Sequence, residues 1–258
     1  MNHETLLLVV AAVAGLFCGF LNAVASSGSA VSLPILMALG LRAISADATN
    51  RLPVLVGGIA ATLQLTRQKA IPWRMAFFVS VPTTIGAIAG ALVAEATPSS
   101  DLRLFIVAAV VMALVVILTK LRKLISSAHT GETRFGVREV ILFLLVGLWL
   151  GFIMLDGATY VLLILVLAVR LPLISANAIK NFILVPTTLV AMIIFASKGS
   201  IDWELGGLMA SGSVVGGLLG ARLSVSEQAK KWIIGLLITV IVGELINLII
   251  RYCLDLLR

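Results

Sequence analysis

Residues 43–48 read AISADA, and residues 173–178 read LISANA. The two segments lie 130 residues apart, and the same spacing separates Ile71-Pro72-Trp73 from Ile201-Asp202-Trp203. Similarity that recurs at a constant spacing indicates a structural unit that is present twice. Further matches at or near this spacing are Gly86 and Gly90 with Gly216 and Gly220, and Gly19-Phe20 with Gly151-Phe152. We therefore predict two homologous membrane repeats, residues 1–125 and 136–258, joined by a cytoplasmic linker at residues 126–135.

Each repeat is too apolar for a water-soluble domain. Of the 258 residues, 60% are hydrophobic and 12% are charged, whereas soluble domains hold about 25% charged residues. Several apolar runs, among them Leu6–Val24, Ala76–Ala94 and Trp232–Ile250, approach or exceed the roughly 20 residues with which a helix crosses a bilayer. This composition predicts an all-α polytopic membrane protein with about four membrane helices in each repeat. The two cysteines, Cys18 and Cys253, fall in apolar segments and are expected to pack as small hydrophobic residues.

The net charge is +7, and the basic residues are concentrated at helix ends and in two loops. One loop reads TRQKAIPWR at residues 66–74, and the other includes the linker. Such clusters are typical of cytoplasmic loops, and they form no continuous patch of the kind that binds nucleic acid. Ala23-Val24-Ala25 resembles a signal-peptidase site, but no Lys or Arg precedes it. We therefore expect a retained first membrane helix in a multi-pass protein of the cell inner membrane.

The segment that opens each repeat is apolar but interrupted. Residues 19–40 read GFLNAVASSGSAVSLPILMALG, and residues 155–167 read LDGATYVLLILVL. Small and polar residues at this depth are typical of a broken or re-entrant helix whose free backbone groups face a cavity. The alternative is close helix packing through small residues, and this is the interpretation that we prefer for Gly86, Gly90, Gly216 and Gly220.

The path of residues 28–40 decides between two topologies. If this segment dips into the membrane and returns, each repeat has four crossings and the repeats are parallel. If the segment crosses, each repeat has five crossings and the repeats are inverted. The distribution of basic residues is compatible with both arrangements.

The next helix of each repeat carries an amide and a cation side by side, Asn50-Arg51 and Lys180-Asn181. Ser45 and Ser175 are the predicted N-caps of these helices, which places the two pairs at matching depth. Asp47 stands four residues before Arg51, an orientation that favours an ion pair, whereas Lys180 has an alanine at that position. The alternative is that both cations snorkel to the membrane interface.

Asp156 lies in one of the most apolar stretches of the chain. A buried charge usually persists by pairing with an opposite charge, and Lys180 is the cation of the same repeat that has no local partner. We hypothesise that Asp156 and Lys180 compensate each other, with Thr159 and Tyr160 beside them. Alternatively, Asp156 carries a coupling proton, and Glu244 is a second candidate for that role.

Amides, hydroxyls and cations close to the N-termini of broken helices favour a small anion, because these groups donate hydrogen bonds and helix N-termini add positive potential. The candidate substrate-binding residues are Asn22, Ser26, Ser27, Gly28, Ser29, Thr49, Asn50, Arg51, Asp156, Thr159, Tyr160, Asn177, Lys180 and Asn181. The only histidines are His3 and His129, and there is no ATP-binding loop, so neither a metal site nor a cofactor is expected. The expected partners are the anion and the lipid bilayer, with a coupling proton and a homodimer as further options.

Several of these motifs occur together in one known family. Residues 25–41 read ASSGSAVSLPILMALGL, followed by SADATNR at 45–51 and by a loop that ends in IPW at 71–73. With the duplicated unit, and with GFIMLDGATYVLL and ANAIKN in the second repeat, the chain resembles the TauE/SafE family of sulfite exporters, also called the toluene-sulfonate uptake permease family. The resemblance covers nearly the whole chain, although SSGS and LDGA replace the glycine-rich run that is common in the family. It implies a multi-pass inner-membrane permease for sulfur-containing anions such as sulfite or sulfonates.

The predicted function is secondary transport of a small sulfur-containing oxyanion or organosulfonate, by alternating access between the two repeats. A membrane-embedded enzyme is the alternative from another class, but the sequence contains no visible nucleophile–base pair or metal-ligand cluster. A transporter of an unrelated small anion and a scaffold component are the remaining alternatives. Charges at matched depth in two repeats argue against a scaffold.

Overall fold

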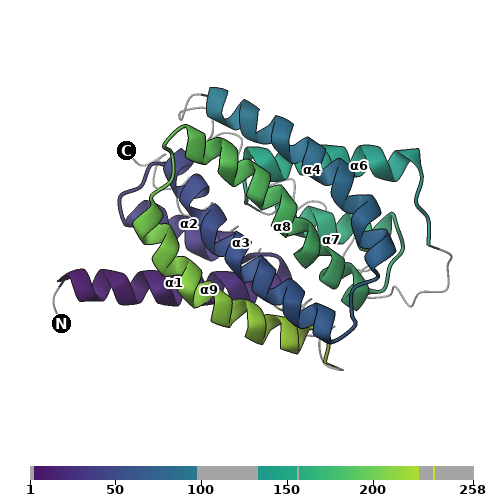
Figure 1. Ribbon diagram of the computed structural model, residues 1–258, viewed down its shortest axis with the longest axis horizontal. Coiled ribbons are helices and arrows are strands. Elements are labelled where there is room, and N and C mark those ends of the chain that lie inside the picture. The colour runs from purple at the N-terminus through teal and green to yellow at the C-terminus, as the bar shows by residue number, and fades with distance from the viewer. Residues whose placement is uncertain (1–2, 98–132, 156, 227–234, 236–258) are drawn as a thin grey trace, which may run out of the picture.

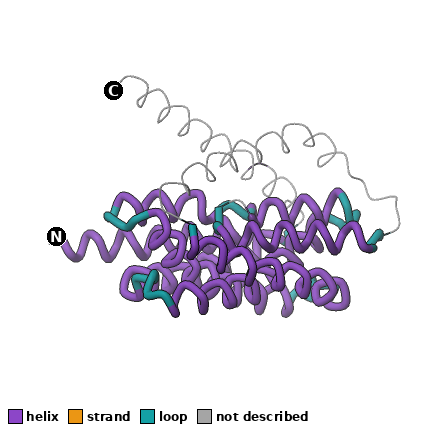
Figure 2. Tube along the Cα trace, turned by 90° about the horizontal axis from the view of Figure 1, so that it is seen from above, coloured by secondary structure: helices purple, strands orange, loops and turns teal. Residues whose placement is uncertain are grey.

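The computed structural model describes residues 3–97, 133–155, 157–226 and 235, and in these ranges all regular secondary structure is helical. The described helices are α1 (His3–Ala25), α2 (Gly28–Ala38), α3 (Ala43–Arg67), α4 (Trp73–Ala96), α6 (Val137–Phe152), α7 (Gly157–Leu167), α8 (Leu173–Ser197) and α9 (Trp203–Ser224). They form a bundle that is wider than it is deep (Figures 1 and 2). Residues 126–132 of the predicted linker lie outside the described residues.

Glycines hold two helix pairs in backbone contact, α1 along α9 and α4 along α6 (Figure 1). A Cβ added at Gly216 would lie 2.0 Å from the Leu16 carbonyl oxygen, and one added at Gly90 would lie 1.9 Å from the Leu148 carbonyl oxygen. Because no real Cβ approaches an oxygen so closely, only glycine permits these contacts. The close packing predicted for Gly86, Gly90, Gly216 and Gly220 is therefore confirmed.

α3 and α8 pack against each other and run in opposite directions (Figure 1). The chain leaves α3 and reaches Trp73, whose ring packs at 5.4 Å against Phe182 in the first half of α8. The chain leaves α8 and reaches Asp202, whose N–H donates to Thr49 Oγ1 at 3.0 Å in the first half of α3. Each of these two helices therefore starts beside the loop that follows the other.

Four described helices are long and apolar enough to cross a membrane, namely α1 over Leu8–Ala25, α4, α8 and α9. α4 exposes large apolar side chains at Phe77, Val81, Ile85 and Leu92, a spacing that places them along one side of the helix. Such a stripe is unfavourable in water and favourable against lipid tails. α2 and α7 have 11 residues each and are too short to cross. The chain is thus a polytopic helical membrane protein.

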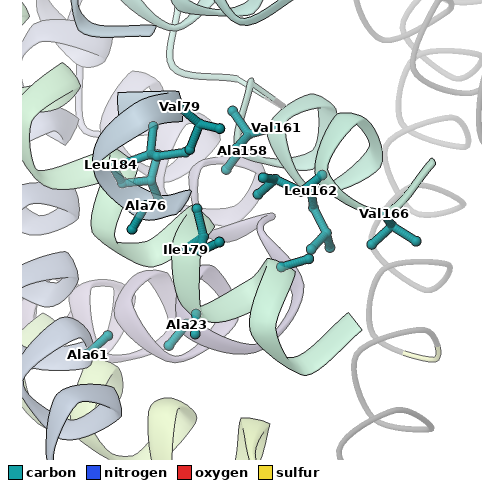
Figure 3. Close-up of a cluster of buried hydrophobic side chains, with 14 of the residues drawn as sticks. Ala23, Ala61, Ala76, Val79, Ala158, Val161, Leu162, Val166, Ile179 and Leu184 are labelled. Atoms are coloured by element: carbon teal, nitrogen blue, oxygen red, sulfur yellow. The ribbon is translucent and has the colours of Figure 1, made fainter. Parts of the chain in front are cut away.

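The core between the helices is built from small and aliphatic side chains. Figure 3 shows one cluster of such side chains, contributed by α1, α3, α4, α7 and α8, with Ala23, Ala61, Val79, Ala158 and Ile179 among them. Small side chains allow helices to approach closely where hydrocarbon surrounds the bundle. This packing brings the ends of the interrupted helices against α3 and α8.

The interruptions lie where the sequence predicts broken helices. α1 ends at Ala25, Ser26 has a φ of 69°, and α2 begins at Gly28. α2 folds back against α1, since a Cβ on Gly28 would lie 2.1 Å from the Cys18 carbonyl oxygen. Similarly, α6 ends at Phe152 and α7 begins at Gly157. The last carbonyl groups of α1 and α6 therefore need partners from outside their own helices.

The prediction of N-caps at Ser45 and Ser175 is wrong. α3 and α8 begin before these residues, so both serines lie in the first helical turn. Arg42 and Pro172 are extended, and their carbonyl oxygens accept the first helical hydrogen bonds. The serine hydroxyls are consequently past the position from which a cap reaches the free N–H groups.

Asp202 is a side-chain N-cap, because its Oδ1 accepts a hydrogen bond from the Leu205 N–H at 3.0 Å. Asp202→Ala is expected to lower the free energy of unfolding by about 1 kcal/mol, the typical cost of a lost N-cap, whereas Asp202→Ser retains most of the stability. Ser45→Ala is the control and is expected to change stability by less than about 0.5 kcal/mol. Unfolding in mixed micelles by SDS titration measures both, and equal losses in the two alanine variants would contradict the assignment.

Candidate functional site

α8 holds the interruption between α1 and α2, here called the α1 break (residues 22–29). Lys180 Nζ donates a hydrogen bond to the Asn22 carbonyl oxygen. Asn177 Nδ2 and Asn181 Nδ2 donate to the Ala23 carbonyl oxygen at 2.8 and 3.1 Å. All three α8 side chains are buried. A cation and two amides thus bind two of the carbonyl groups that are left free at the end of α1, where the helix dipole is negative.

α3 holds the interruption between α6 and α7, here called the α6 break (residues 150–157), in a similar way. Arg51 donates to the carbonyl oxygens of Leu150 and Gly151 at 3.1 and 2.8 Å. Its guanidinium also pairs with Asp47 at 2.7 Å. The other carboxylate oxygen of Asp47 accepts a hydrogen bond from the Met154 N–H at 2.8 Å. This ion pair therefore binds backbone groups on both sides of the point where α6 ends.

These contacts decide two of the sequence predictions. The Asp47–Arg51 ion pair is confirmed. Snorkelling is wrong for both cations, because Arg51 and Lys180 are each 0% exposed. The physical reason is that interrupted helices provide carbonyl acceptors inside the bundle, so neither head group needs to reach the membrane interface.

Asn50 connects α3 to α2 and α1. Its Oδ1 accepts a hydrogen bond from Ser32 Oγ at 2.5 Å, and its Nδ2 donates to Ser29 Oγ at 3.0 Å. Cys18 Sγ lies 3.8 Å from the same Asn50 Oδ1 and 3.7 Å from Asn22 Nδ2. From the sequence, Cys18 is expected only to pack as a buried hydrophobic residue. The signal that points to its polar role is its position one helical turn before Asn22, on the same side of α1.

Several buried polar atoms at the breaks have no hydrogen-bond partner among the described residues. At the α1 break these are the hydroxyls of Ser26 and Ser27, which are 3% and 2% exposed. Thr159 Oγ1, in the first turn of α7, and Asn177 Oδ1 on α8 are likewise unpartnered. Buried polar groups are nearly always satisfied in proteins. Such atoms can hydrogen-bond to an ordered water or to a ligand.

The remaining predicted site residues lie in different surroundings. Gly28 N–H donates to Asn22 Oδ1 at 2.9 Å and so belongs to the α1 break. Thr49 Oγ1 accepts a hydrogen bond from the Asp202 N–H in the loop before α9, so this side chain binds neither the α1 break nor the α6 break. Tyr160 packs its ring edge-on against Trp149 at 6.3 Å.

Asp156 and Glu244 lie outside the described residues, so the Asp156–Lys180 pair and the proton-carrier roles remain hypotheses. Within the part of the chain that the structure describes, no group of three His, Cys, Asp or Glu side chains could hold a metal ion. The chemistry that the described groups offer is hydrogen-bond donation and positive charge. Hydroxyls, amides and cations of this kind bind anions through charge-assisted hydrogen bonds, without covalent steps.

Comparisons with known proteins agree with a transport role. The family model described as "Sulfite exporter TauE/SafE" matches residues 11–245. The "Probable membrane transporter protein" of Haemophilus influenzae is 26% identical over 231 residues, which are 86% of each chain. The "Probable membrane transporter protein YfcA" of Escherichia coli (strain K12) is 26% identical over 230 residues, 87% of this chain and 83% of the relative.

A third relative is the "Probable membrane transporter protein ORF9" of a Sinorhizobium species, which is 25% identical over 224 residues, 87% of this chain and 85% of the relative. No solved structure matches the chain at a significant level. The family and the names of these relatives indicate a membrane transporter and not an enzyme, so the enzyme alternative is dropped. The chain belongs to the sulfite exporter TauE/SafE family.

Proposed function

We propose that the protein is a secondary transporter of a small sulfur-containing oxyanion, such as sulfite or an organosulfonate. The observation that carries the proposal is a set of buried hydroxyls that have no hydrogen-bond partner in the described part of the chain, close to the N-terminal ends of α2 and α7, namely those of Ser26, Ser27 and Thr159. A buried donor that lacks an acceptor is unfavourable. An oxyanion offers several acceptor oxygens, and the positive potential of a helix N-terminus favours it further.

The buried cations and the family support an anionic, sulfur-containing substrate. Arg51 and Lys180 lie one on each of the two central helices, and both are removed from solvent. The family name refers to sulfite export. An inner-membrane location and a coupling proton carried by Asp156 or Glu244 belong to the same proposal.

The proposed mechanism is alternating access between the two repeats, residues 1–125 and 136–258. Its support is the reciprocity of the helix contacts: α1 packs on α9 and α6 packs on α4, while α3 packs on α9 and α8 packs on α4. α3 and α8, which carry the AISADA and LISANA segments, run in opposite directions (Figure 1). Two such repeats can exchange their conformations, which opens the central site to one side of the membrane and then to the other.

Transport by purified protein in liposomes tests the function. Wild-type protein is expected to accumulate ³⁵S-labelled sulfite above the level of empty liposomes, and Lys180→Met is expected to reduce the initial rate at least about tenfold, because about 1.4 kcal/mol of lost charge-assisted binding corresponds to that factor. Lys198→Met is the matched control, since Lys198 is an exposed lysine that directly follows α8, and it should keep the wild-type rate.

Three outcomes would contradict the proposal. The first is sulfite uptake by wild-type protein that does not exceed the uptake by empty liposomes. Equal losses in Lys180→Met and Lys198→Met would indicate an unspecific charge effect. Uptake of labelled chloride without uptake of sulfite or an organosulfonate would identify a transporter of an unrelated small anion.

A further inference from the structure

We propose that the two buried cations have different roles: Lys180 contacts the transported anion, whereas Arg51 is a positioning residue that fixes the end of α6 and does not contact the anion. The sequence presents the two cations as equivalents in a duplicated unit, and the structure surrounds them differently. This inference rests on the proposed function, and it places the cation that contacts the anion on α8, beside the α1 break.

The hydrogen-bonding and electrostatic capacity of Arg51 is largely used within the protein. Its Nη atoms bind the Asp47 carboxylate and two carbonyl oxygens at the end of α6. The guanidinium carbon lies 4.6 Å from the centre of the Phe195 ring, which favours a fixed cation over its face. Of the three guanidinium nitrogens of Arg51, only Nε has no hydrogen-bond partner in the described part of the chain. An anion at Arg51 would have to displace Asp47 or approach that carboxylate, and like charges repel strongly in an apolar interior.

Asp47 also binds the chain beyond the end of α6. One carboxylate oxygen binds the Arg51 guanidinium, and the other accepts a hydrogen bond from the Met154 N–H beyond the end of α6. The pair therefore holds the last carbonyl groups of α6 and the chain that follows with one salt-bridged unit on α3. Such an arrangement suits a part that moves as a rigid body and not one that exchanges partners with a substrate.

Lys180 has a different environment, because the position equivalent to Asp47 is the amide Asn177. Of its three donors, one reaches the Asn22 carbonyl oxygen. No carboxylate of the described residues lies within 4.0 Å of its ammonium group, since Arg51 and Asp47 form the salt bridge that these residues contain. A buried cation of this kind is stabilised when an anion binds beside it.

Three of the polar atoms without a partner among the described residues belong to the α1 break and to α8, which carries Lys180. Ser26 and Ser27 follow Asn22, the residue that Lys180 binds, by four and five positions in the sequence, and both hydroxyls are buried with no partner among the residues that the structure describes. Asn177, one helical turn before Lys180, also contacts the α1 break, and its Oδ1 has no hydrogen-bond partner within the described ranges. A cation with free donor capacity and two free hydroxyls on one chain segment are the groups that an oxyanion requires.

Sulfite transport by variants of the full chain in proteoliposomes tests this division. Lys180→Arg keeps the charge but changes its shape and reach, and it is expected to raise the KM for ³⁵S-sulfite at least tenfold. Arg51→Lys is expected to lower the maximal rate at least fivefold and to lower the unfolding midpoint, with the KM within twofold of wild type. Phe195→Leu removes the ring beside the guanidinium but keeps the ion pair. It is expected to lower the maximal rate and the unfolding midpoint by smaller amounts, again with little change in the KM.

The KM and the maximal rate separate the possible results. A tenfold rise of the KM in Arg51→Lys or Phe195→Leu would overturn the positioning role. An unchanged KM in Lys180→Arg would overturn the anion contact. Should Arg51→Lys not fold, the Phe195→Leu and Lys180→Arg values decide. Absence of sulfite uptake by wild-type protein would instead contradict the proposed function and this assignment with it, so the two failures are distinguishable.

Discussion

Asp47→Asn is expected to lower the free energy of unfolding by about 3–5 kcal/mol, the cost typical of leaving one member of a buried ion pair uncompensated. Arg51 is 0% exposed and Asp47 is 3% exposed, so bulk water cannot solvate the guanidinium that has lost its counter-charge. Asparagine keeps the shape of the side chain and an oxygen that can accept the Met154 N–H, so the loss reports mainly on charge. The measurement is reversible unfolding of the purified protein by SDS in mixed micelles.

A double variant gives the internal control. Asp47→Asn combined with Arg51→Met removes both charges, and it is expected to be more stable than the sum of the two single losses predicts, by about 1–3 kcal/mol of coupling. Glu204→Gln changes an exposed carboxylate on α9 and should cost less than about 0.5 kcal/mol. Strictly additive losses in the double variant would show that the two side chains do not act as a pair.

Gly216→Ala is expected to have the second large effect, a loss of about 3 kcal/mol at the upper end of the range for overpacked contacts. The added methyl group would lie 2.0 Å from the Leu16 carbonyl oxygen and 2.8 Å from the Phe20 nitrogen. Both are backbone atoms, so no side chain can rotate away, and α9 must separate from α1. The free energy of unfolding in mixed micelles measures the loss, and weakened transport is expected to accompany it.

Gly207→Ala is the matched control on the same helix. A Cβ at Gly207 meets nothing within 4 Å, and the residue is exposed. Alanine favours a helix over glycine by up to about 1 kcal/mol, so Gly207→Ala should be neutral or stabilising. If the two variants had the same stability, the close approach of α1 and α9 would not be a determinant of the fold.

Much of the fold could be predicted from local patterns. Apolar composition indicates membrane helices because hydrocarbon admits few charges, and this property does not depend on the rest of the structure. The break after Ala25 lies at SSGS, where small polar residues favour an interruption, whereas Ser211-Gly212-Ser213 continue α9 without a break. The close approach at Gly216 and Gly220 was likewise visible as a spacing of four residues on one helix face.

Other features of the site depend on partners that are distant in the sequence. The N-cap prediction at Ser45 failed because the loop before α3 determines where the first helical hydrogen bond forms. The partners of Arg51 on α6 are about 100 residues away along the chain, and no spacing rule indicates them. The apolar setting predicts a buried Cys18, which is confirmed, but its contact with Asn50 requires α1, α2 and α3 to be assembled.

The amino-acid sequence by itself determined that this chain is a helical membrane protein, where its first helices break, and which few polar side chains are kept in an apolar setting. These features follow from short-range chemistry, that is, from hydropathy, backbone preference and a neighbour one turn away. Only the tertiary structure decided that each buried cation binds the broken end of a helix from the other half of the chain. The reason is that a carbonyl group loses its helical partner at a break, and the donor that replaces the partner is whichever side chain the packing of the helices brings within reach.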